Sequence, residues 1–446
     1  MTYRAIGAVA LALCSMFAVP VQAGQPMALE ARLANPVMKG GEGVKNYLRV
    51  ALQGCKPEPN QTRTPVNVAF VIDRSGSMGG MPIAQAREAA IMAANRLLPS
   101  DIAAVVIFDH AVDVLVPAQP VTDPSTFTDQ IRLVTARGST AIHAGVLVGA
   151  AEVAKNKDAH RLNRVVLLSD GQANVGPSRP DDFAVLGRAL LSQGISVSTI
   201  GLGMRYNEDL MLQLARASDG NHAFARDPSD LITIFNKEFD DVLGSCAQTV
   251  SVDIELKPGV KAVRALSRDG VIEGQTAKFT FNQIYAATEH YVLVEVELDK
   301  ALATDGEQEL GVVKVAYTAP DSDARQSLDA TIRGRFTASD AEVKAGVDAK
   351  VAEAVVEQVT RERAQRAVTL QDQGKIKEAR DLLLQNAAQI QGLAAVVAPS
   401  KRMLELQQHY SALGAQSAPT TAHQMNLGRK ALRALENTQA GSGVRY

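Results

Sequence analysis

The pattern of apolar and polar residues between positions 64 and 202 alternates between short apolar runs and longer amphipathic stretches. The apolar runs have the length of strands and are expected to be buried on both faces: 66–72, 102–108, 164–169 and 195–201. The longer stretches are expected to be helices: 82–98, 141–154 and 183–193. This alternation predicts an α/β unit with a doubly wound, mostly parallel sheet that helices cover on both faces.

On both sides of this unit the pattern changes to a period of two. Residues 28–33 and 45–52 alternate in this way around a glycine-rich turn at 40–43, which predicts a β-hairpin. Further alternating segments are separated by Gly, Asp and Pro and predict an antiparallel β-sandwich: 250–256, 277–281, 291–298, 311–317 and 328–336. If the hairpin completes this sandwich, the α/β unit is an insertion whose ends lie together; otherwise the sandwich follows it.

The last part of the chain has helical patterns. Residues 339–342 form a capping box, and valines recur every four residues from there to Val359, so one long amphipathic helix is expected to begin here. A break at 372–374 separates it from two further helices: 376–390 and one capped by Ser400. The pair around the break resembles a single tetratricopeptide-like hairpin. Because no repeat accompanies it, a packed stalk or domain brace is favoured over a peptide-binding module.

These patterns divide the chain into consecutive parts. The tail is rich in Ala, Gln, Thr, Ser and Gly, so we expect little order there apart from a short helix near 427–435. The predicted parts are a signal peptide at 1–23, a hairpin with linker at 24–62, the α/β domain at 63–245, a β-sandwich domain at 246–337, a helical domain at 338–413 and a mostly disordered tail at 414–446.

The first 23 residues are typical of a secretory signal. Arg4 precedes an apolar stretch that ends at Val21, and Val21-Gln22-Ala23 fits a cleavage site. A membrane anchor is the alternative, but the stretch is short for a span and Pro20 interrupts it. We expect cleavage after Ala23, export to the periplasm or the cell exterior, and no transmembrane segment in the mature chain.

The chain has three cysteines, of which Cys14 lies in the signal segment. Cys55 and Cys246 remain, on either side of the α/β domain. Because thiols tend to pair in an oxidising compartment, we predict a disulfide between them; two free thiols are the alternative.

The charges are nearly balanced, with 46 Lys and Arg against 48 Asp and Glu. Such a balance argues against nucleic acid as a partner.

Side chains with oxygen atoms follow the buried strands at three separate points. The candidate residues are Asp73, Ser75 and Ser77 after the strand at 66–72, Thr140 before the helix at 141–154, and Asp170 after the strand at 164–169. The carboxyl ends of parallel strands meet at one edge of a sheet, so we expect these side chains to converge. Carboxylate and hydroxyl oxygens are ligands for Mg²⁺, Ca²⁺ or Mn²⁺. The small number of carboxylates favours Mg²⁺, because Ca²⁺ usually gathers more oxygens.

Other polar residues near these loops are weaker candidates. His110 and His143 stand beside apolar segments, where a lone histidine is more often packed or exposed to solvent than a ligand. Asp109 is expected to be a solvated loop carboxylate, with a water-mediated role as the alternative. We therefore do not include these residues in the predicted site.

The candidate residues also resemble a known site. Asp73-Arg74-Ser75-Gly76-Ser77, the Thr of Gly138-Ser139-Thr140, and Ser169-Asp170-Gly171 resemble the metal-ion-dependent adhesion site of von Willebrand factor type A domains, over about residues 63–245. More loosely, segments such as Asp219-Gly220-Asn221 resemble a bacterial secreted branch related to inter-alpha-trypsin inhibitor heavy chains and calcium-activated chloride channel homologues.

The resemblance implies a doubly wound fold and a divalent metal that bridges to an acidic group of a partner protein. Asp73, Ser75 and Ser77 would be direct ligands, and Thr140 and Asp170 direct or water-mediated ones. We therefore expect an exported, metal-dependent module that binds a protein presenting Asp or Glu. The alternative is a structural scaffold of the cell envelope in which the metal only stabilises the fold. No enzyme is expected, because the sequence has no nucleophile elbow, phosphate loop or His-Glu-x-x-His motif.

Overall fold

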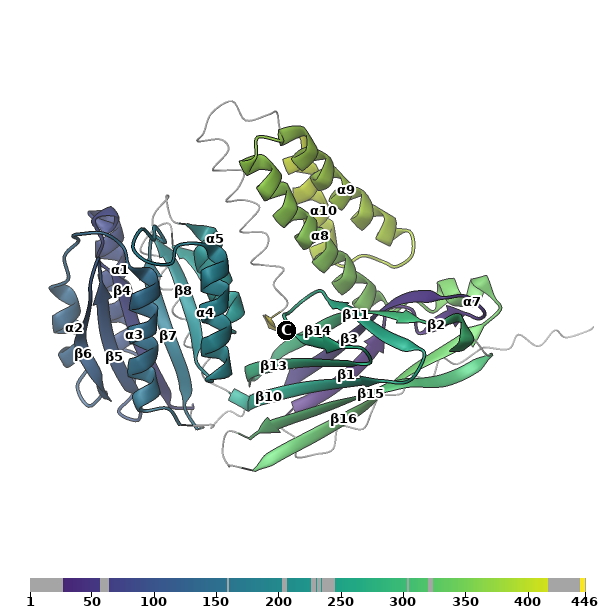
Figure 1. Cartoon of the computed structure of the whole chain (residues 1–446), viewed down its shortest axis with the longest axis horizontal. Coiled ribbons are helices and arrows are strands. Elements are labelled where there is room, and N and C mark those ends of the chain that lie inside the picture. Colours follow the sequence, from purple (N-terminus) through teal and green to yellow (C-terminus); the bar gives the residue numbers. More distant parts are fainter. Residues whose placement is uncertain are drawn as a thin grey trace, which may run out of the picture.

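The structure is a computed structural model that describes residues 27–56, 64–158, 160–202, 207–225, 230, 234, 245–302, 305–319, 324–415 and 442–445. It contains an α/β domain, a β-sandwich and a helical segment, which are seen separately in Figure 1. The predicted signal peptide, and the predicted short helix near 427–435, lie outside the described residues. Within the described ranges, no helix is both long enough and apolar enough to span a membrane.

The α/β domain is built around one sheet with the strand order β6-β5-β4-β7-β8-β9. Its strands are β4 (Val66–Asp73), β5 (Ile102–Phe108), β6 (Val112–Pro120), β7 (Leu162–Ser169), β8 (Ser196–Leu202) and β9 (His222–Ala225). The neighbours run parallel except for β6, which pairs antiparallel with β5. The predicted mostly parallel sheet is confirmed. The edge strands β6 and β9 were not predicted, because they are short or partly exposed and lack a continuous apolar run.

Helices cover both faces of this sheet (Figure 1). On one face lie α1 (Met81–Ala94) and α2 (Ser125–Arg132), and on the other lie α3 (Ile142–Lys155), α4 (Pro180–Ser192) and α5 (Glu208–Ala217). Strand β4 shows how the sequence fits both layers. Phe70 and Ile72 belong to the first core, whereas Ala69 and Val71 belong to the second. A strand between two helical layers must be apolar at successive positions, which explains the continuous run.

The β-sandwich has two sheets around a shared apolar core. One sheet has the order β1-β3-β14-β11, with β17 also paired to β14, and the other has the order β12-β13-β10-β15-β16-β2. The strands are β1 (Met27–Leu33), β2 (Val37–Lys39), β3 (Val44–Gly54), β10 (Ser245–Leu256), β11 (Val260–Ala265), β12 (Val271–Glu273), β13 (Thr276–Tyr285), β14 (Thr288–Leu298), β15 (Gly306–Thr318), β16 (Arg325–Thr337) and β17 (Ser442–Arg445). The predicted antiparallel sandwich is confirmed; among its described strands, only the short β2 pairs parallel, with β16.

The α/β domain is an insertion in the sandwich. Strand β3 pairs with β1 and also with β14, so the N-terminal hairpin belongs to the sandwich. The chain then forms the α/β domain and returns to the sandwich at β10. Cys55 and Cys246 form the predicted disulfide at this neck, with their Cα atoms 5.6 Å apart.

The helical segment departs from the prediction at its beginning. Its helices are α7 (Asp340–Ala345), α8 (Ala349–Asp372), α9 (Ile376–Ala394) and α10 (Lys401–Ala415). The prediction of one long helix after Ser339 is wrong, because α7 ends at Gly346 and Asp348 starts a new helix. The Asp348 side chain accepts a hydrogen bond from the Val351 amide at 3.0 Å, which is the usual way for an N-cap to begin a helix.

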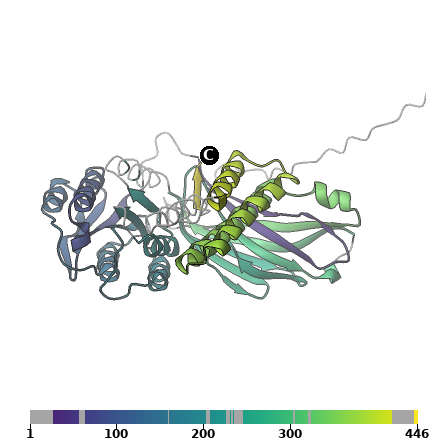
Figure 2. The ribbon, with the colours of Figure 1, turned by 90° about the horizontal axis from the view of Figure 1, so that it is seen from above.

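Helix α8 packs against the sandwich. Val351 and Val355 contact the apolar cluster that contains Leu293 of β14, and Gln358 donates a hydrogen bond to the Tyr291 hydroxyl at 2.8 Å. Figure 2 shows the yellow-green helices lying over the sandwich strands. Helices α9 and α10 pack together with the rest of α8 in a separate apolar cluster. Helices α8, α9 and α10 therefore form a helical brace, which α8 anchors on the sheet that contains β14.

We expect the double variant Cys55→Ser/Cys246→Ser to be less stable than the wild-type protein. The bond joins residues that are 191 positions apart, and losing such a constraint on the unfolded chain costs roughly 2 to 5 kcal/mol. Calorimetric scans with and without reductant measure the effect. Reductant should lower the unfolding temperature of the wild-type protein toward that of the variant and leave the variant unchanged. Equal unfolding temperatures for all four samples would contradict the prediction.

Candidate functional site

The first predicted loop begins with a buried carboxylate. Asp73 is the last residue of β4 and has no exposed surface, and its Oδ1 accepts a hydrogen bond from the Ser75 amide at 2.8 Å. The hydroxyl oxygens of Ser75 and Ser77 are 3.1 Å apart. Ser75 is buried whereas Ser77 is exposed. The oxygens of this loop therefore extend from the interior of the domain to its surface.

The second loop lies beside the first because β7 pairs parallel with β4. The Ser169 hydroxyl donates to Asp73 Oδ2 at 2.5 Å, and the Gly171 amide donates to the Ser169 hydroxyl at 2.8 Å. Asp170, between them, is 5% exposed. Ser169 stands in the sequence motif, but we predicted no role for it. In the structure it holds the Asp73 carboxylate against the Asp170 loop.

The third loop carries Thr140, which is 1% exposed. The Gly76 amide donates to the Gly138 carbonyl at 2.9 Å, which joins this loop to the first. Asn174 Oδ1 accepts from the Thr140 amide at 2.7 Å, and the Thr140 carbonyl accepts from the Asn174 amide at 3.1 Å. Asn174 was not predicted, because it stands in a polar segment with no strand or helix pattern. The structure thus brings the three predicted loops together.

Asp109 holds two of these loops in place. It has no exposed surface, and its Oδ2 is 3.0 Å from Arg74 Nε and 3.0 Å from Arg137 Nε. Arg74 lies within the first loop, and Arg137 precedes Gly138 in the third. The Asp109 carbonyl also accepts from the Ala141 amide, next to Thr140, at 2.7 Å. The prediction of a solvated carboxylate is wrong, because the sequence does not reveal that these distant arginines meet on Asp109.

The charge state of Asp109 follows from the same contacts. Burial alone would raise the pKa of Asp109, but the Ala111 amide and the guanidinium groups of Arg137 and Arg74 together lower it below its ordinary value. His110 Nδ1 also lies 3.0 Å from Asp109 Oδ1, although its side chain is 65% exposed. His143 instead makes an edge-on contact with the Phe183 ring, with centroids 5.8 Å apart.

Asp73 has the opposite electrostatic environment. Burial raises the pKa of Asp73 to about 6; hydrogen bonds from Ser169 and Ser75 oppose this shift, and the charge of Asp170 adds to it. Within the part of the chain that the structure describes, no three His, Cys, Asp or Glu side chains gather into a metal cluster. A cation here would therefore draw on the hydroxyls of Ser75, Ser77 and Thr140 as well. Two carboxylates and three hydroxyls fit a hard divalent cation, and their roles as ligands stay a prediction.

We expect the stability of the protein to depend on pH through Asp73. Its pKa of about 6 in the folded state lies above the ordinary value, so the metal-free folded protein binds a proton more tightly than the unfolded chain. Metal-free protein should therefore lose stability, on the order of 2 to 3 kcal/mol, as the pH rises from about 4 to about 6. Stabilisation by Mg²⁺ should instead grow over that interval, because the cation requires the carboxylate form.

Thermal scans of metal-free and Mg²⁺-saturated protein between pH 4 and pH 8 test this prediction, with Asp73→Asn as the variant. The amide does not ionise, so the variant should lose both the contribution of Asp73 to the pH dependence and the response to Mg²⁺. A variant that keeps the wild-type slope over this interval would assign the pH dependence to another group.

We also expect Asp109→Asn to weaken metal binding without removing a predicted ligand. The amide removes the charge that holds Arg74 and Arg137, and loss of such a supporting contact typically lowers metal affinity about 10- to 100-fold. Titration with Mg²⁺ and Mn²⁺ measures the affinity. The matched control is Asp113→Asn, because Asp113 also pairs with Arg74, at 2.6 Å, but is 56% exposed. Equal losses in the two variants would contradict the special role of Asp109.

Comparison with known proteins identifies the domain that carries these loops. Residues 67–237 match the family model of the von Willebrand factor type A domain. An uncharacterized protein of Synechocystis sp. is 28% identical over 293 residues, which cover 64% of this chain and 68% of that protein. Human inter-alpha-trypsin inhibitor heavy chain H3 is 32% identical over 173 residues, which cover 36% of this chain. The match spans only 19% of the human protein, about a fifth of its length.

The same fold is present in a solved structure. A von Willebrand factor type A protein from Catenulispora acidiphila superposes with a TM-score of 0.71, although it is only 17% identical. The superposition covers 95% of this chain and 98% of that one, so the likeness extends beyond the α/β domain. Domains of this type typically mediate protein–protein interactions and often bind a metal. Residues 67–237 of the chain therefore form a domain that matches the von Willebrand factor type A model and has the fold of such domains.

Proposed function

We propose that the chain is an exported interaction module that binds a divalent cation, with Mg²⁺ favoured, and through it a carboxylate of a partner protein. Asp73, Ser75, Ser77, Thr140 and Asp170 would hold the cation. The observation that carries the proposal is the burial of the Asp73 carboxylate without a compensating positive charge from the described part of the chain. It is fully buried, and among the described residues no Lys or Arg forms an ion pair with it. A cation from solution would supply the missing positive charge.

Comparison with other buried carboxylates supports this interpretation. Asp109 and Asp219 are also buried, but each pairs with arginine, and the pKa of each is lowered below its ordinary value in spite of burial. The pKa of Asp73 is raised to about 6. An uncompensated buried charge destabilises a fold, so its retention at a surface loop is typical of a functional site.

The loops have separate roles in the proposed site. The carboxylates of Asp73 and Asp170 would balance the charge of a divalent cation, and the three hydroxyls would complete only part of its shell. The exposure of Ser77 leaves the outer side accessible to a partner. When bound, the cation supplies a positive charge for an Asp or Glu of the partner, in a partly shielded place where this attraction is screened less than in bulk water.

Two further features support an exported interaction protein. The disulfide between Cys55 and Cys246 fits an oxidising compartment, and the N-terminal sequence fits a cleavable signal. Relatives such as inter-alpha-trypsin inhibitor heavy chain H3 share the type A domain. We therefore favour interaction over catalysis, and place the protein in the periplasm or outside the cell.

Affinity capture with the full mature chain tests the function. Immobilised wild-type protein, incubated with cell-envelope extract in Mg²⁺, should retain a partner that EDTA releases and added Mg²⁺ restores. Asp73→Ala should capture none of it. The control Asp129→Ala removes an exposed carboxylate that pairs with Arg132 on the same helix, α2, and it should behave as wild type. A partner that stays bound in EDTA and to Asp73→Ala would instead favour the envelope scaffold, in which the metal only stabilises the fold.

A further inference from the structure

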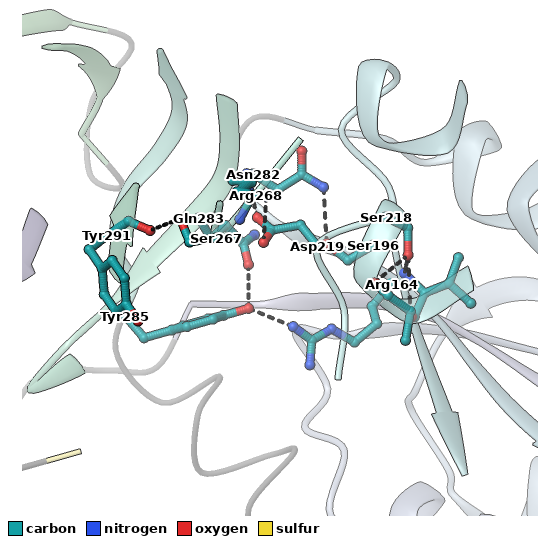
Figure 3. A network of polar contacts seen from close by, with 12 residues as sticks. Arg164, Ser196, Ser218, Asp219, Ser267, Arg268, Asn282, Gln283, Tyr285 and Tyr291 are labelled. Atoms are coloured by element: carbon teal, nitrogen blue, oxygen red, sulfur yellow. Dashed lines mark hydrogen bonds and ion pairs between the residues drawn. The ribbon is translucent and has the colours of Figure 1, made fainter. Parts of the chain in front are cut away.

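The α/β domain and the sandwich meet in a polar junction, shown in Figure 3. Asp219 of the α/β domain lies 2.8 Å from Arg268 of the sandwich, and its Oδ2 accepts from the Asn282 amide of β13 at 2.8 Å. The two charged side chains are only 9% and 14% exposed. The Arg268 guanidinium also lies over the Phe281 ring, 4.1 Å from its centroid. The ion pair is thus enclosed by both domains.

The backbone at Asp219 supports a specific role for this ion pair. Asp219 has a φ of 60°, in the left-handed region that is unfavourable for residues with a side chain. Glycine would adopt this conformation without strain. The aspartate instead places a carboxylate across the domain boundary, where Arg268 and Asn282 receive it. Strain of this kind persists only where the surrounding contacts hold it.

Asp219 is connected to the proposed metal site by one helix. Helix α5 begins beside the Asp170 loop and ends at Ala217, two positions before Asp219. The Asn207 amide donates to the Asp170 carbonyl at 2.9 Å, and the Asn207 side chain caps α5 by accepting from the Leu210 amide. Gly171, with a φ of 67°, lies so close that an added Cβ would be 2.9 Å from the Asn207 nitrogen. The loop and the helix therefore have little room to move independently.

Helix α5 is itself firmly held. Met211 and Leu214 have no exposed surface, and a Cβ added at Gly187 of α4 would lie 2.7 Å from Ala217 Cβ, so the two helices are in close contact. At its end, the Ser218 hydroxyl donates to the Leu214 carbonyl at 2.8 Å and accepts from the Val197 amide at 3.0 Å. A displacement at either end of α5 would therefore be passed to the other end.

The strand that precedes Asp170 also reaches the sandwich. Arg164, near the start of β7, donates to the Tyr285 hydroxyl of β13 at 2.5 Å (Figure 3). Beside it, Asn282 Nδ2 of β13 donates to the Ser196 hydroxyl of β8 at 3.0 Å. The Asp170 loop follows β7 in the chain and is bonded to the start of α5 through the Asn207 amide. The far ends of both elements thus contact the same strand, β13.

We propose that the Asp219–Arg268 pair is an interdomain latch through which the sandwich holds the Asp170 loop in its metal-binding position. Asp219 and Arg268 are positioning residues, which act through α5 and the Asn207–Asp170 hydrogen bond. A change that separates the two domains at this junction releases the loop and weakens the metal site, and metal binding in turn tightens the junction. The inference rests on the proposed metal site and adds the means by which the rest of the chain regulates it.

Arg268→Gln in the full mature chain tests the latch. The metal affinity, measured by titration with Mg²⁺ and Mn²⁺ alone, should fall roughly fivefold or more. In metal-free protein, the amides of Gly171 and Asn207 should exchange hydrogen faster than in wild type. The matched control is Arg333→Gln, since Arg333 pairs with Glu307 on the exposed side of the sandwich, 3.7 Å away, and touches no part of the latch. It should leave affinity and exchange unchanged.

Arg268→Gln leaves the buried Asp219 carboxylate without its ion pair, which could prevent folding. A second variant keeps the test decisive in that case. Asp219→Asn/Arg268→Gln replaces the ion pair by two neutral amides, and it should show the same weakened affinity and faster exchange. Wild-type exchange at Gly171 and Asn207 in the folded variants overturns the latch, whether or not the protein binds metal. Wild-type metal affinity in these variants overturns it as well. A wild-type protein that binds neither ion contradicts the proposed function instead, and the exchange data still decide the latch.

Discussion

The burial of a carboxylate that the described chain does not neutralise is the constraint on which the proposed metal site depends. Asp73 lies at the end of the central strand β4, between helical layers that exclude water from its side chain. Ser75 and Ser169 hold its two oxygens, and burial still raises its pKa to about 6. Desolvation disfavours the charged form, and the hydrogen bonds from the two serines do not outweigh it; a nearby positive charge would add to their effect. The three loops around Asp73 therefore enclose a carboxylate that a positive charge would stabilise. A purely structural turn has no such requirement.

Two other buried aspartates are compensated by arginines of the chain itself. Asp109 receives Arg74 and Arg137, and Asp219 receives Arg268. Each of these pairs joins segments that are distant in sequence, so neutralisation and the positioning of loops are achieved by the same contact. The Asp109 pairs fix two of the loops of the proposed metal site relative to each other, whereas the Asp219 pair fixes the α/β domain to the sandwich. Asp73 differs because no Lys or Arg among the described residues pairs with it, and in the proposed function an external ion supplies that charge.

The sequence was sufficient where a property depends on residues that are near one another in the chain. The apolar runs gave the parallel strands, the period of two gave the sandwich, and the strand ends located Asp73, Thr140 and Asp170. It failed where a contact joins distant segments. Nothing local shows that Arg137 reaches Asp109, that Asn174 bonds to Thr140, or that Asp219 crosses to Arg268. The long helix expected after Ser339 failed for a local reason, because the capping preference of Asp348 outweighed the valine stripe.

Strand β14 links the junction to the helical brace. Its His290 ring packs edge-on against Phe281, the residue on which Arg268 lies, and the next residue, Tyr291, accepts a hydrogen bond from Gln358 of α8. Glu289, just before them, pairs with Arg49 of β3 and with Lys350 of α8. Three consecutive residues of one strand thus contact the neighbouring strand, the junction and the brace. Because packed interiors transmit strain, a brace that stiffens β14 also stiffens the surface that receives Arg268. The helical segment, remote from Asp73 in sequence, is therefore connected through β14 to the junction that is proposed to position the metal site.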